Sequence, residues 1–550
     1  MKSHEATKGP GRAAARSLFY SMGFSTEELK KPLIGICNAF SEIVPGHAHL
    51  REVVEAVKTG ISAAGGAPVE FPAIGLCDSI AMGHVGMRYS LPSRELIADS
   101  VEAMAHAHAF DGLVLVPNCD KIVPGMLMAA ARTNVPSIVI SGGPMLAGRY
   151  RGKNVSLSAL LEASGRFQAG VIDQQELSRL EKAACPGCGS CAGLFTANTM
   201  NCLTEVLGLG LPGNGTVPAA YSGERRRMAK EAGKIIISLV EKDIRPRDIL
   251  QLENFQNAVA LDMAIGGSTN TILHLLAIAY EAGIELTLDH FDAISARTPY
   301  LTGLSPSGPW HMQDLNEAGG ISAVLHELAS IGAINTSALT VTGPLNERID
   351  HALVENRAVI FSPAQPIRPC GGIAILKGNL APDGAVVKES AVKEDMLLYT
   401  GYARVFNSEQ EAVDAILSGK IVDGDVVVIR YEGPKGGPGM REMHTPAALV
   451  TGMGLKVALI TDGRFGGATQ GACIGHVGPE AAQGGVIGLL KDGDTIHIDI
   501  PARKLEVALT PQELAARWVK MPLPPDRLMK GYLARYARMV SEARYGAVLK

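Results

Sequence analysis

The 550-residue sequence has no large excess of either charge, no long hydrophobic run and no supported nucleotide-binding motif. Its formal net charge is −4, so we expect no binding to nucleic acid or to an anionic membrane surface. No segment offers the roughly 18 uninterrupted apolar residues that a membrane-spanning helix needs. Residues 1–23 contain no apolar core ahead of a cleavage site, and the cytoplasm is therefore the expected compartment.

Nucleotide binding has no support from motifs. The pattern G-x-x-x-x-G-K-[ST], which holds nucleoside triphosphates, does not occur. Residues 208–213 (GLGLPG) fit G-x-G-x-x-G, but they do not follow a predicted strand and they contain a proline. We therefore do not expect a dinucleotide site there.

The composition is that of a compact, loop-rich globular enzyme of two large domains. Apolar residues make up 47%, charged residues 19%, and there are 62 glycines. A chain of this length exceeds what one hydrophobic core usually supports. Nine cysteines, an odd number, are more plausible in a reducing compartment as ligands, catalytic groups or buried apolar residues than as disulfides.

The order of predicted elements indicates two kinds of domain. Residues 32–37 and 113–117 are predicted strands and residues 49–64 and 94–108 predicted helices, an alternation typical of a layered α/β domain with a largely parallel sheet. Residues 362–366 (SPAQP) are typical of a linker. After it, short apolar runs separated by glycine turns predict a β-rich, barrel-like domain. The predicted domains span residues 1–355 and 366–550.

Residues 118–121 (NCDK) combine a thiol, a carboxylate and an amine in one loop. The loop follows the predicted strand 113–117, and Pro124 stands where a helix tolerates proline, in its first turn. Ligands of open α/β sheets usually bind at this carboxyl end of a strand. A thiolate suits iron or zinc and a carboxylate suits magnesium or manganese, so the loop can serve two metals. The alternative is a plain turn beside a buried cysteine.

A second cysteine cluster and three glycine-rich loops add to the functional pattern. Cys185, Cys188 and Cys191 form CPGCGSC, a C-x2-C-x2-C spacing used by iron–sulfur sites. Zinc is a weaker alternative because no paired C-x-x-C or H-x3-H partner occurs, and a redox dithiol is weaker still. The loops 266–270 (GGSTN), 432–442 (EGPKGGPGMRE) and 462–471 (DGRFGGATQG) are either ligand-binding loops or plain turns.

Several long motifs together resemble the dihydroxy-acid dehydratases, in the family that also holds phosphogluconate and sugar-acid dehydratases. They are residues 77–100 (CDSIAMGHVGMRYSLPSRELIADS), 117–126 (PNCDKIVPGM), 185–203 (CPGCGSCAGLFTANTMNCL), 266–271 (GGSTNT), 378–388 (GNLAPDGAVVK), 430–440 (RYEGPKGGPGM) and 458–465 (ALITDGRF). The resemblance runs nearly end to end. It implies an α/β/α N-terminal domain and a C-terminal β-barrel-like swivel domain, assembled as a homodimer or homotetramer.

The resemblance also implies a reaction and a small-molecule substrate. The family removes water from 2,3-dihydroxy acids to give 2-oxo acids, and residues 191–200 (CAGLFTANTM) favour the 2,3-dihydroxy-3-methylbutanoate type of valine and isoleucine biosynthesis. A sugar-acid (aldonate) dehydratase is the alternative. Such a reaction needs a Lewis acid for the C3 hydroxyl, a hard cation for the carboxylate and C2 oxygen, and a base for the C2 proton.

Cluster ligands carry over to two cysteines, with a third open. Cys119 and Cys191 resemble ligands of the family's cluster, which is either [2Fe–2S] or [4Fe–4S]. In the plant-type two-iron enzymes a further cysteine stands where this chain has Ala39. Cys37 and Cys77 are the candidates for that role, and Cys37 is preferred because residues two apart on a strand face the same side.

Magnesium ligands carry over to four residues. Asp78, Asp120 and Glu442 resemble the family's Mg²⁺ ligands. Lys121 resembles the family lysine that, as a carbamate, adds another oxygen ligand. An unmodified ammonium would repel the ion.

The base is the clearest departure from the family. The family motif reads D-G-R-F-S-G, and its serine removes the C2 proton, whereas this chain has Gly466 at that place. Glycine has no group that accepts a proton. Another residue must then act as the base, with Thr469 as the nearest hydroxyl, or turnover is reduced, or the chain is a non-catalytic cluster-bearing paralogue.

Overall fold

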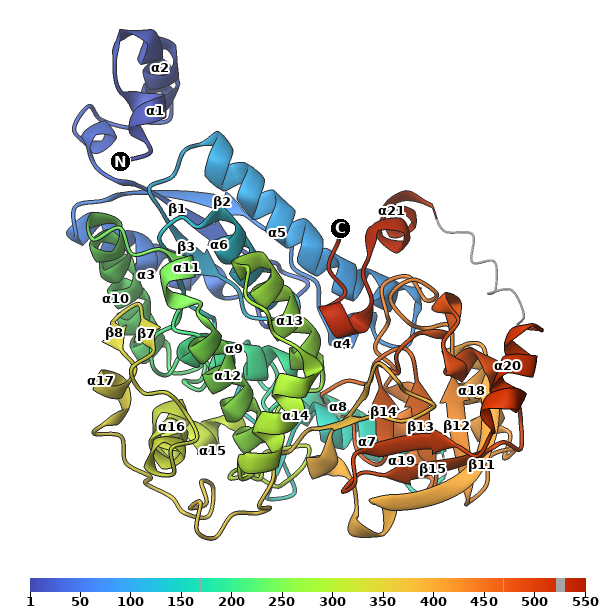
Figure 1. Cartoon of the computed structure of the whole chain (residues 1–550). Coiled ribbons are helices and arrows are strands. Elements are labelled where there is room, and N and C mark those ends of the chain that lie inside the picture. The colour runs from blue at the N-terminus through green and yellow to red at the C-terminus, as the bar shows by residue number, and fades with distance from the viewer. Residues whose placement is uncertain (169, 468, 521–529) are drawn as a thin grey trace.

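A four-stranded sheet in the first half of the chain and an eight-stranded sheet in the second half organise the protein (Figure 1). The structure is a computed structural model that describes residues 1–168, 170–467, 469–520 and 530–550. The predicted mixed α/β class is confirmed. In the described ranges, no helix combines the length and the apolar character that crossing a bilayer requires.

The first sheet is parallel throughout and has the order β2-β1-β3-β4. Its strands are β1 (Leu33–Asn38), β2 (Ala67–Pro72), β3 (Gly112–Val116) and β4 (Ser137–Val139). Every residue of β1 and β3 is buried, as expected of parallel strands that are covered on both faces and read as continuous apolar runs.

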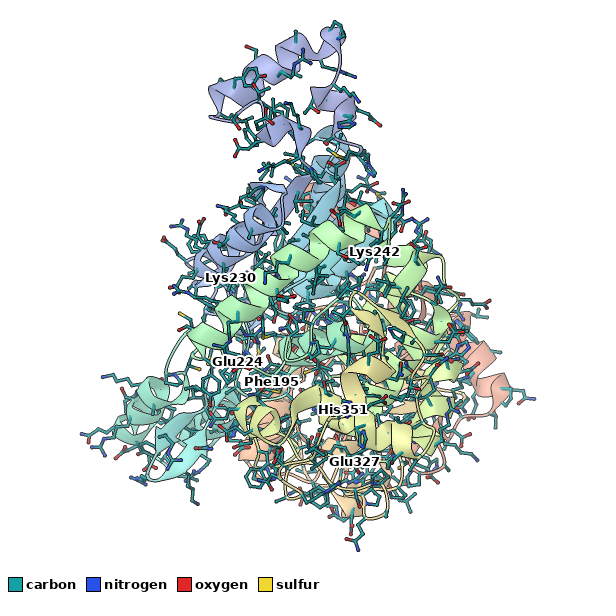
Figure 2. The ribbon with its side chains drawn as sticks, turned by 90° about the vertical axis from the view of Figure 1, so that its left-hand side faces the viewer. Phe195, Glu224, Lys230, Lys242, Glu327 and His351 are labelled. Carbon is teal, nitrogen blue, oxygen red and sulfur yellow. The ribbon has the colours of Figure 1, made fainter. Side chains whose placement is uncertain are left out.

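Two helices beside this sheet cross at very short range. They are α3 (Leu50–Ala63) and α10 (Ser222–Glu241). In Figure 2, Glu224 and Lys230 mark the course of α10, and Lys242 follows its last residue. A Cβ on Gly60 would overlap the backbone of Lys230, and a Cβ on Gly233 would overlap the carbonyl of Val57. The two glycines therefore set the distance between the helices.

Central helices fill the space between the first sheet and the second half of the chain. All residues of α9 (Thr196–Val206) are buried, and α6 (Ile122–Thr133) lies between α5 (Ser90–Ala107) and α13 (Asn270–Ala282). Helix α9 is buried although many of its residues are polar, and its asparagines are satisfied by hydrogen bonds: Asn198 Nδ2 donates to the Gly193 carbonyl and Asn201 Nδ2 to the Asn118 carbonyl. Further helices are α1 (His4–Thr7), α2 (Ala13–Ser21), α4 (Asp78–Ala81), α7 (Leu157–Gln168), α8 (Gln174–Ala184), α11 (Pro246–Ile249), α12 (Leu252–Ile265), α14 (Leu288–Arg297), α15 (Met312–Glu317), α16 (Gly320–Ser330) and α17 (Asn346–Ile349).

The second sheet is nearly closed into a barrel, as predicted. Its order is β16-β15-β11-β12-β13-β14-β10-β9, and its strands are β9 (Ala374–Leu376), β10 (Ala385–Val387), β11 (Leu398–Phe406), β12 (Asp425–Ile429), β13 (Ala458–Thr461), β14 (Cys473–Gly475), β15 (Thr495–Asp499) and β16 (Lys504–Val507). The two outer strands approach each other where Lys377 bridges to Lys504 and the Leu505 N–H donates to the Lys377 carbonyl. Helices α18 (Glu409–Leu417), α19 (Thr445–Gly452) and α20 (Pro511–Trp518) accompany this sheet, and β5 (Gly148–Tyr150), β6 (Lys153–Val155), β7 (Leu339–Thr340) and β8 (Gly343–Pro344) form two small hairpins elsewhere.

The end of the chain returns to the N-terminal part. After α21 (Gly531–Met539), the carbonyls of Gly546 and Ala547 accept hydrogen bonds from the buried guanidinium of Arg94 in α5. Figure 1 shows the C-terminus beside α5, with α4 close to the place where the two halves meet. Residues that are far apart in sequence therefore build the region around α4.

Candidate metal centre

Three predicted carboxylates converge from three separate segments. Asp78 begins α4, Asp120 follows β3, and Glu442 precedes α19. One oxygen of each lies within 4.8 Å of the others. Asp78 and Glu442 are only 6% and 3% exposed. Carboxylate oxygens gathered in this way are the ligands that Mg²⁺ and Mn²⁺ prefer.

Lys121 lies among these carboxylates. Its Nζ is 2.6 Å from Asp78 Oδ2, 3.5 Å from Asp120 Oδ2 and 3.7 Å from Glu442 Oε2, and the residue is 1% exposed. Burial raises the pKa of Asp120 to about 6, although Lys121 opposes the shift. Burial also acts to raise the pKa of Glu442, but Lys121 and Arg464 hold that pKa well below its usual range. The ammonium group of Lys121 thus lies among the three carboxylates, where their oxygens would otherwise favour a metal cation.

Glu442 is held by residues of two other predicted motifs. Its Oε2 accepts hydrogen bonds from Arg464 Nη1 and from Asn270 Nδ2, both at 2.8 Å. Arg464 is fully buried and comes from the motif after β13, whereas Asn270 begins α13. His444 Nε2 lies 3.2 Å from the other oxygen, Oε1. The loops that sequence analysis could only describe as sites or turns therefore orient this carboxylate.

The hydrogen bonds of Asp78 show whether its carboxylate is free to bind a cation. Its Oδ2 accepts a hydrogen bond from Ser90 Oγ at 2.7 Å in addition to the contact with Lys121. Its Oδ1 is buried and finds no hydrogen-bond partner among the residues that the structure describes. Buried carboxylate oxygens are normally paired, so an unpaired one beside two further carboxylates fits a metal ligand.

Three cysteines lie near one another beside the carboxylates. Burial raises the pKa of the Cys119 thiol well above its ordinary value, and Cys77, Asp120 and Cys191 raise it further. Burial likewise raises the pKa of Cys191, with Asp120 and Cys77 adding to the shift. The charges of Cys77 and Cys191 act on Cys119, and those of Cys77 and Cys185 act on Cys191, so Cys77, Cys119 and Cys191 lie near one another and Cys185 lies near Cys191. Cys119 is buried, and Cys77 and Cys191 are partly exposed. A group of thiols whose charged forms repel one another fits a site for a thiophilic metal, because the metal supplies the missing positive charge.

Cys37 does not share these neighbours. It lies in β1, and burial is the cause that raises the pKa of its thiol. Ala39 lies beyond the last residue of the strand, and its carbonyl contacts His47 Nδ1 at 2.5 Å. His47 Nε2 in turn accepts a hydrogen bond from the Cys119 N–H at 3.0 Å. Ala39 stands where the resemblance predicts a further cluster cysteine. Its carbonyl is thus connected through the His47 ring to the loop that contains Cys119.

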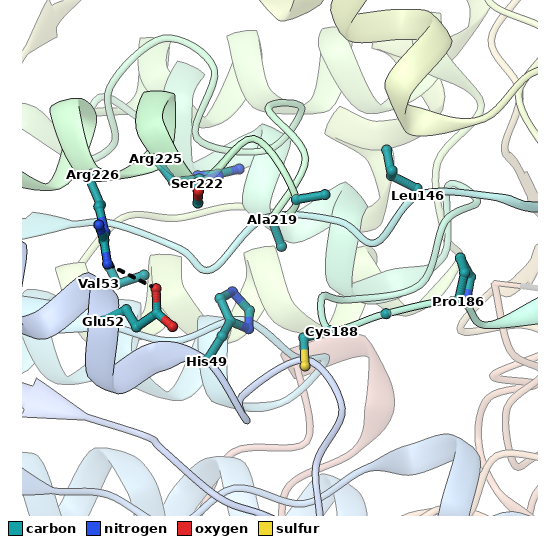
Figure 3. A pocket seen from close by; sticks show the side chains of 12 residues that line it. His49, Glu52, Val53, Leu146, Pro186, Cys188, Ala219, Ser222, Arg225 and Arg226 are labelled. Carbon is teal, nitrogen blue, oxygen red and sulfur yellow. Dashed lines mark hydrogen bonds and ion pairs between the residues drawn. The ribbon is translucent and has the colours of Figure 1, made fainter.

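Cys185 and Cys188 lie at the surface, apart from the carboxylates. Both are exposed, and Cys188 lines a pocket of about 300 Å³ together with His49 and Arg226 (Figure 3). Glu52 and Arg226 form an ion pair of 3.2 Å across this pocket. The three converging carboxylates do not line the pocket, so it is separate from the buried site.

Family models match nearly the whole chain. The model described as dihydroxy-acid/6-phosphogluconate dehydratase N-terminal matches residues 31–348, and the corresponding C-terminal model matches residues 358–547. The chain belongs to the dihydroxy-acid/6-phosphogluconate dehydratase family. The predicted resemblance is confirmed.

Curated relatives are similar over their full length. The chain is 59% identical to a dihydroxy-acid dehydratase of Caldanaerobacter subterraneus subsp. tengcongensis, with 100% of this chain and 99% of the relative covered. It is 59% identical to the dihydroxy-acid dehydratase of Acetivibrio thermocellus and 58% identical to that of Moorella thermoacetica, with 100% of both chains covered in each case.

Gly466, at the position where the resemblance predicts the family serine, lies directly against the carboxylate site. A Cβ on Gly466 would overlap His444 Nε2 and Glu442 Oε1. Thr469 lies in the same loop, and its N–H donates to the Gly466 carbonyl at 3.0 Å. Its hydroxyl is buried and has no hydrogen-bond partner in the described ranges.

Two site residues of this dehydratase-family chain escaped sequence analysis. His444 stands two positions after Glu442, a spacing that could have drawn attention to it. Lys388 closes the motif of residues 378–388, and its buried Nζ donates to the Gly467 carbonyl at 3.3 Å. Burial lowers the pKa of Lys388 to about 8 and raises that of the neighbouring Asp262 to about 7.

Proposed function

We propose that the chain dehydrates 2,3-dihydroxy acids of the 2,3-dihydroxy-3-methylbutanoate type to 2-oxo acids, in valine and isoleucine biosynthesis. The convergence of Asp78, Asp120 and Glu442 around Lys121, beside a group of neighbouring cysteines, supports this function most directly. The names of the relatives support the same substrate class, since they are dihydroxy-acid dehydratases.

Mg²⁺ is the proposed hard cation, held by Asp78, Asp120 and Glu442. When bound, it would hold the carboxylate and C2 oxygen of the substrate. Lys121 is proposed to join the ligands as a carbamate, because carbon dioxide added to its amine replaces a repelling charge by carboxylate oxygens. Arg464, Asn270 and Ser90 keep the ligand carboxylates oriented through the hydrogen bonds described above.

An iron–sulfur cluster, [2Fe–2S] or [4Fe–4S], is the proposed soft-metal cofactor, with Cys119 and Cys191 as ligands. Cys77 is proposed as the third ligand, because its charge raises the pKa of both Cys119 and Cys191, whereas the pKa of Cys37 is raised by burial. When bound, the cluster would act as the Lewis acid at the C3 hydroxyl of the substrate. A protein that binds zinc at this site would be colourless, whereas an iron–sulfur cluster makes the protein brown.

The assembly and the domain roles belong to the same proposal. We expect an α/β/α layered N-terminal domain, a swivel-like C-terminal domain, and a homodimer or homotetramer. Helix α2 extends away from the rest of the molecule in Figure 1. It exposes Leu18 and Tyr20, and Met22 directly after it is also exposed, which favours contact with another subunit. A cytoplasmic location agrees with nine unpaired cysteines, all within the described residues.

The test is 2-oxo acid formation by anaerobically reconstituted protein. With iron, sulfide and Mg²⁺ supplied, we expect turnover of 2,3-dihydroxy-3-methylbutanoate and bound iron with acid-labile sulfide. In a competition assay we expect gluconate to be a poor substrate, because no feature of the structure favours a sugar acid. Faster turnover of gluconate, or protein that binds neither iron nor sulfide, would contradict the proposal.

A further inference from the structure

The backbone on both sides of Gly466 is held by side chains from other segments. The Phe465 carbonyl accepts a hydrogen bond from Thr269 Oγ1 at 3.4 Å, and the Gly467 carbonyl accepts one from Lys388 Nζ at 3.3 Å. Thr269 directly precedes α13, whereas Lys388 directly follows β10. Two distant parts of the chain therefore fix the peptide groups that flank Gly466.

This short stretch of backbone lies directly against Glu442. A Cβ on Gly466 would overlap Glu442 Oε1, so the backbone of Gly466 is in close contact with that carboxylate. A Cβ on Gly467 would in turn press against the backbone of Phe195 and against Ser268 Oγ. The stretch thus has little room to shift without displacing Glu442.

Lys388 is buried, and its charge is offset by one carboxylate. The residue is 6% exposed, and Asp262 is fully buried. Asp262 acts to raise the pKa of Lys388, and Lys388 acts to lower the pKa of Asp262, so the two groups lie near each other. Glu389, the next residue along the chain, pairs instead with Arg368 and Arg503. Among the described residues, Asp262 is therefore the charged group that favours the ammonium form of Lys388.

Asp262 also supports the second segment that contacts Glu442. Its Oδ2 accepts a hydrogen bond from Thr271 Oγ1. Thr271 directly follows Asn270, whose Nδ2 donates to Glu442 Oε2 at 2.8 Å. The two members of the buried pair thus hold the two segments that lie against this carboxylate.

We propose that Lys388 is a positioning residue of the reaction: its ammonium group fixes the backbone at Gly466 and with it the orientation of Glu442. This inference rests on the proposed dehydration and on the proposed Mg²⁺ ligands. Lys388 acts through the Gly467 carbonyl. Outer partners that orient a metal ligand typically contribute about 10- to 100-fold in metal affinity or activity.

The first test compares Lys388→Met, which removes the charge and keeps an unbranched side chain, with Lys393→Met at an exposed lysine of the same segment. On reconstituted protein we expect Lys388→Met to lower kcat by about 10- to 100-fold, with iron and sulfide content unchanged. We expect Lys393→Met to match the unaltered chain. Equal kcat in the two variants would overturn the role of Lys388.

The second test needs no turnover. On protein without a cluster, we measure the Mg²⁺ concentration that gives half of the Mg²⁺-dependent rise in thermal midpoint. It should be about tenfold higher in Lys388→Met than in Lys393→Met, because Glu442 is less well oriented. The same concentration in both variants would overturn the proposed positioning of Glu442.

The third test is a pH profile, which distinguishes a role of the ammonium group from simple packing. Burial lowers the pKa of Lys388 to about 8. We therefore expect the activity of the unaltered chain to fall above about pH 8. Asp262→Asn removes the charge that favours the ammonium form, so the fall should begin at lower pH.

Lys388→Arg completes this comparison, because arginine keeps its charge throughout this pH range. The fall above about pH 8 should be absent from Lys388→Arg. This variant and Asp262→Asn also decide the question where Lys388→Met does not fold. A fall at the same pH in the unaltered chain, Asp262→Asn and Lys388→Arg would overturn the role of the ammonium group.

The outcomes separate this inference from the proposed function. A reconstituted chain that turns over no dihydroxy acid would overturn the proposed function, whereas the Mg²⁺ response of Lys388→Met still decides the role of Lys388. An unaltered chain without any Mg²⁺ response would overturn the Mg²⁺ site and the role of Lys388 together. An active, Mg²⁺-responsive chain that Lys388→Met leaves unchanged would overturn the role of Lys388 only.

Discussion

At Lys121 a single ammonium group lies within 3.7 Å of oxygens from Asp78, Asp120 and Glu442. Such an arrangement is stable without a metal because the lysine offsets part of the charge of the carboxylates. A divalent cation at the same place competes with the ammonium unless the lysine is modified or moves. Each carboxylate that a substitution removes therefore weakens the hold of the site on magnesium.

Asp78→Asn is expected to weaken Mg²⁺ binding, because it removes one anionic oxygen donor while the ammonium of Lys121 stays. The loss should be at least the roughly tenfold that follows when even an outer partner of a metal ligand is removed. The Mg²⁺-dependent rise of the thermal midpoint measures it. Asp350→Asn, at an exposed position, is the control. An unchanged Mg²⁺ response in Asp78→Asn would remove Asp78 from the site.

The buried pair of Asp262 and Lys388 predicts a pH dependence of stability. Burial raises the pKa of Asp262 from its ordinary value of about 4 to about 7. Between these values the unfolded chain releases the proton and the folded chain keeps it, so stability falls as pH rises from about 4 to about 7. Burial lowers the pKa of Lys388 to about 8, so stability rises again from about pH 8 toward pH 10.

Asp262→Asn should flatten the acidic part of this profile. The free energy of unfolding of the unaltered chain is expected to fall by up to about 1.4 kcal/mol per pH unit from this group alone. Thermal midpoints of cofactor-free protein, recorded from pH 4 to pH 8, would show the difference. Identical slopes for the unaltered chain and Asp262→Asn would contradict the raised pKa.

At the scale of elements, the crossing of α3 and α10 depends on two glycines. Gly233→Ala places a Cβ against the backbone of Val57 and Ile61, which cannot move as a side chain would. We expect a loss of about 1–3 kcal/mol in the free energy of unfolding, the usual cost of overpacking. Gly223→Ala in the same helix meets only the end of Arg227 and serves as the control. Equal stabilities in urea unfolding would show that the crossing tolerates a wider spacing.

Local elements were predictable because their patterns are local. The strand predicted at residues 113–117 is β3 (Gly112–Val116), and the helix predicted at residues 49–64 is α3 (Leu50–Ala63). The preference for Cys37 used the alternation of a strand, but β1 ends at Asn38, so the alternation does not extend to Ala39. His444 escaped notice because its contacts with Glu442 and Gly466 exist only in the folded chain.

At the scale of the whole molecule, the site joins the two halves of the chain. Asp78, Asp120 and Lys121 come from the N-terminal half, whereas Glu442, His444 and Arg464 come from segments around the barrel. The C-terminal residues bind Arg94 in α5 and so tie the halves together a second time. Burial of the site between the halves keeps bulk water from the carboxylates and strengthens their interactions.

The central claim is that this family member dehydrates dihydroxy acids at the buried carboxylate centre. The most direct measurement is the rate of 2-oxo acid formation from 2,3-dihydroxy-3-methylbutanoate by the reconstituted chain, with and without Mg²⁺, beside Asp78→Asn. We predict product that depends on Mg²⁺ and is lost in Asp78→Asn. Product formation that persists without Mg²⁺ and in Asp78→Asn, or no product from cofactor-loaded protein, would contradict the account.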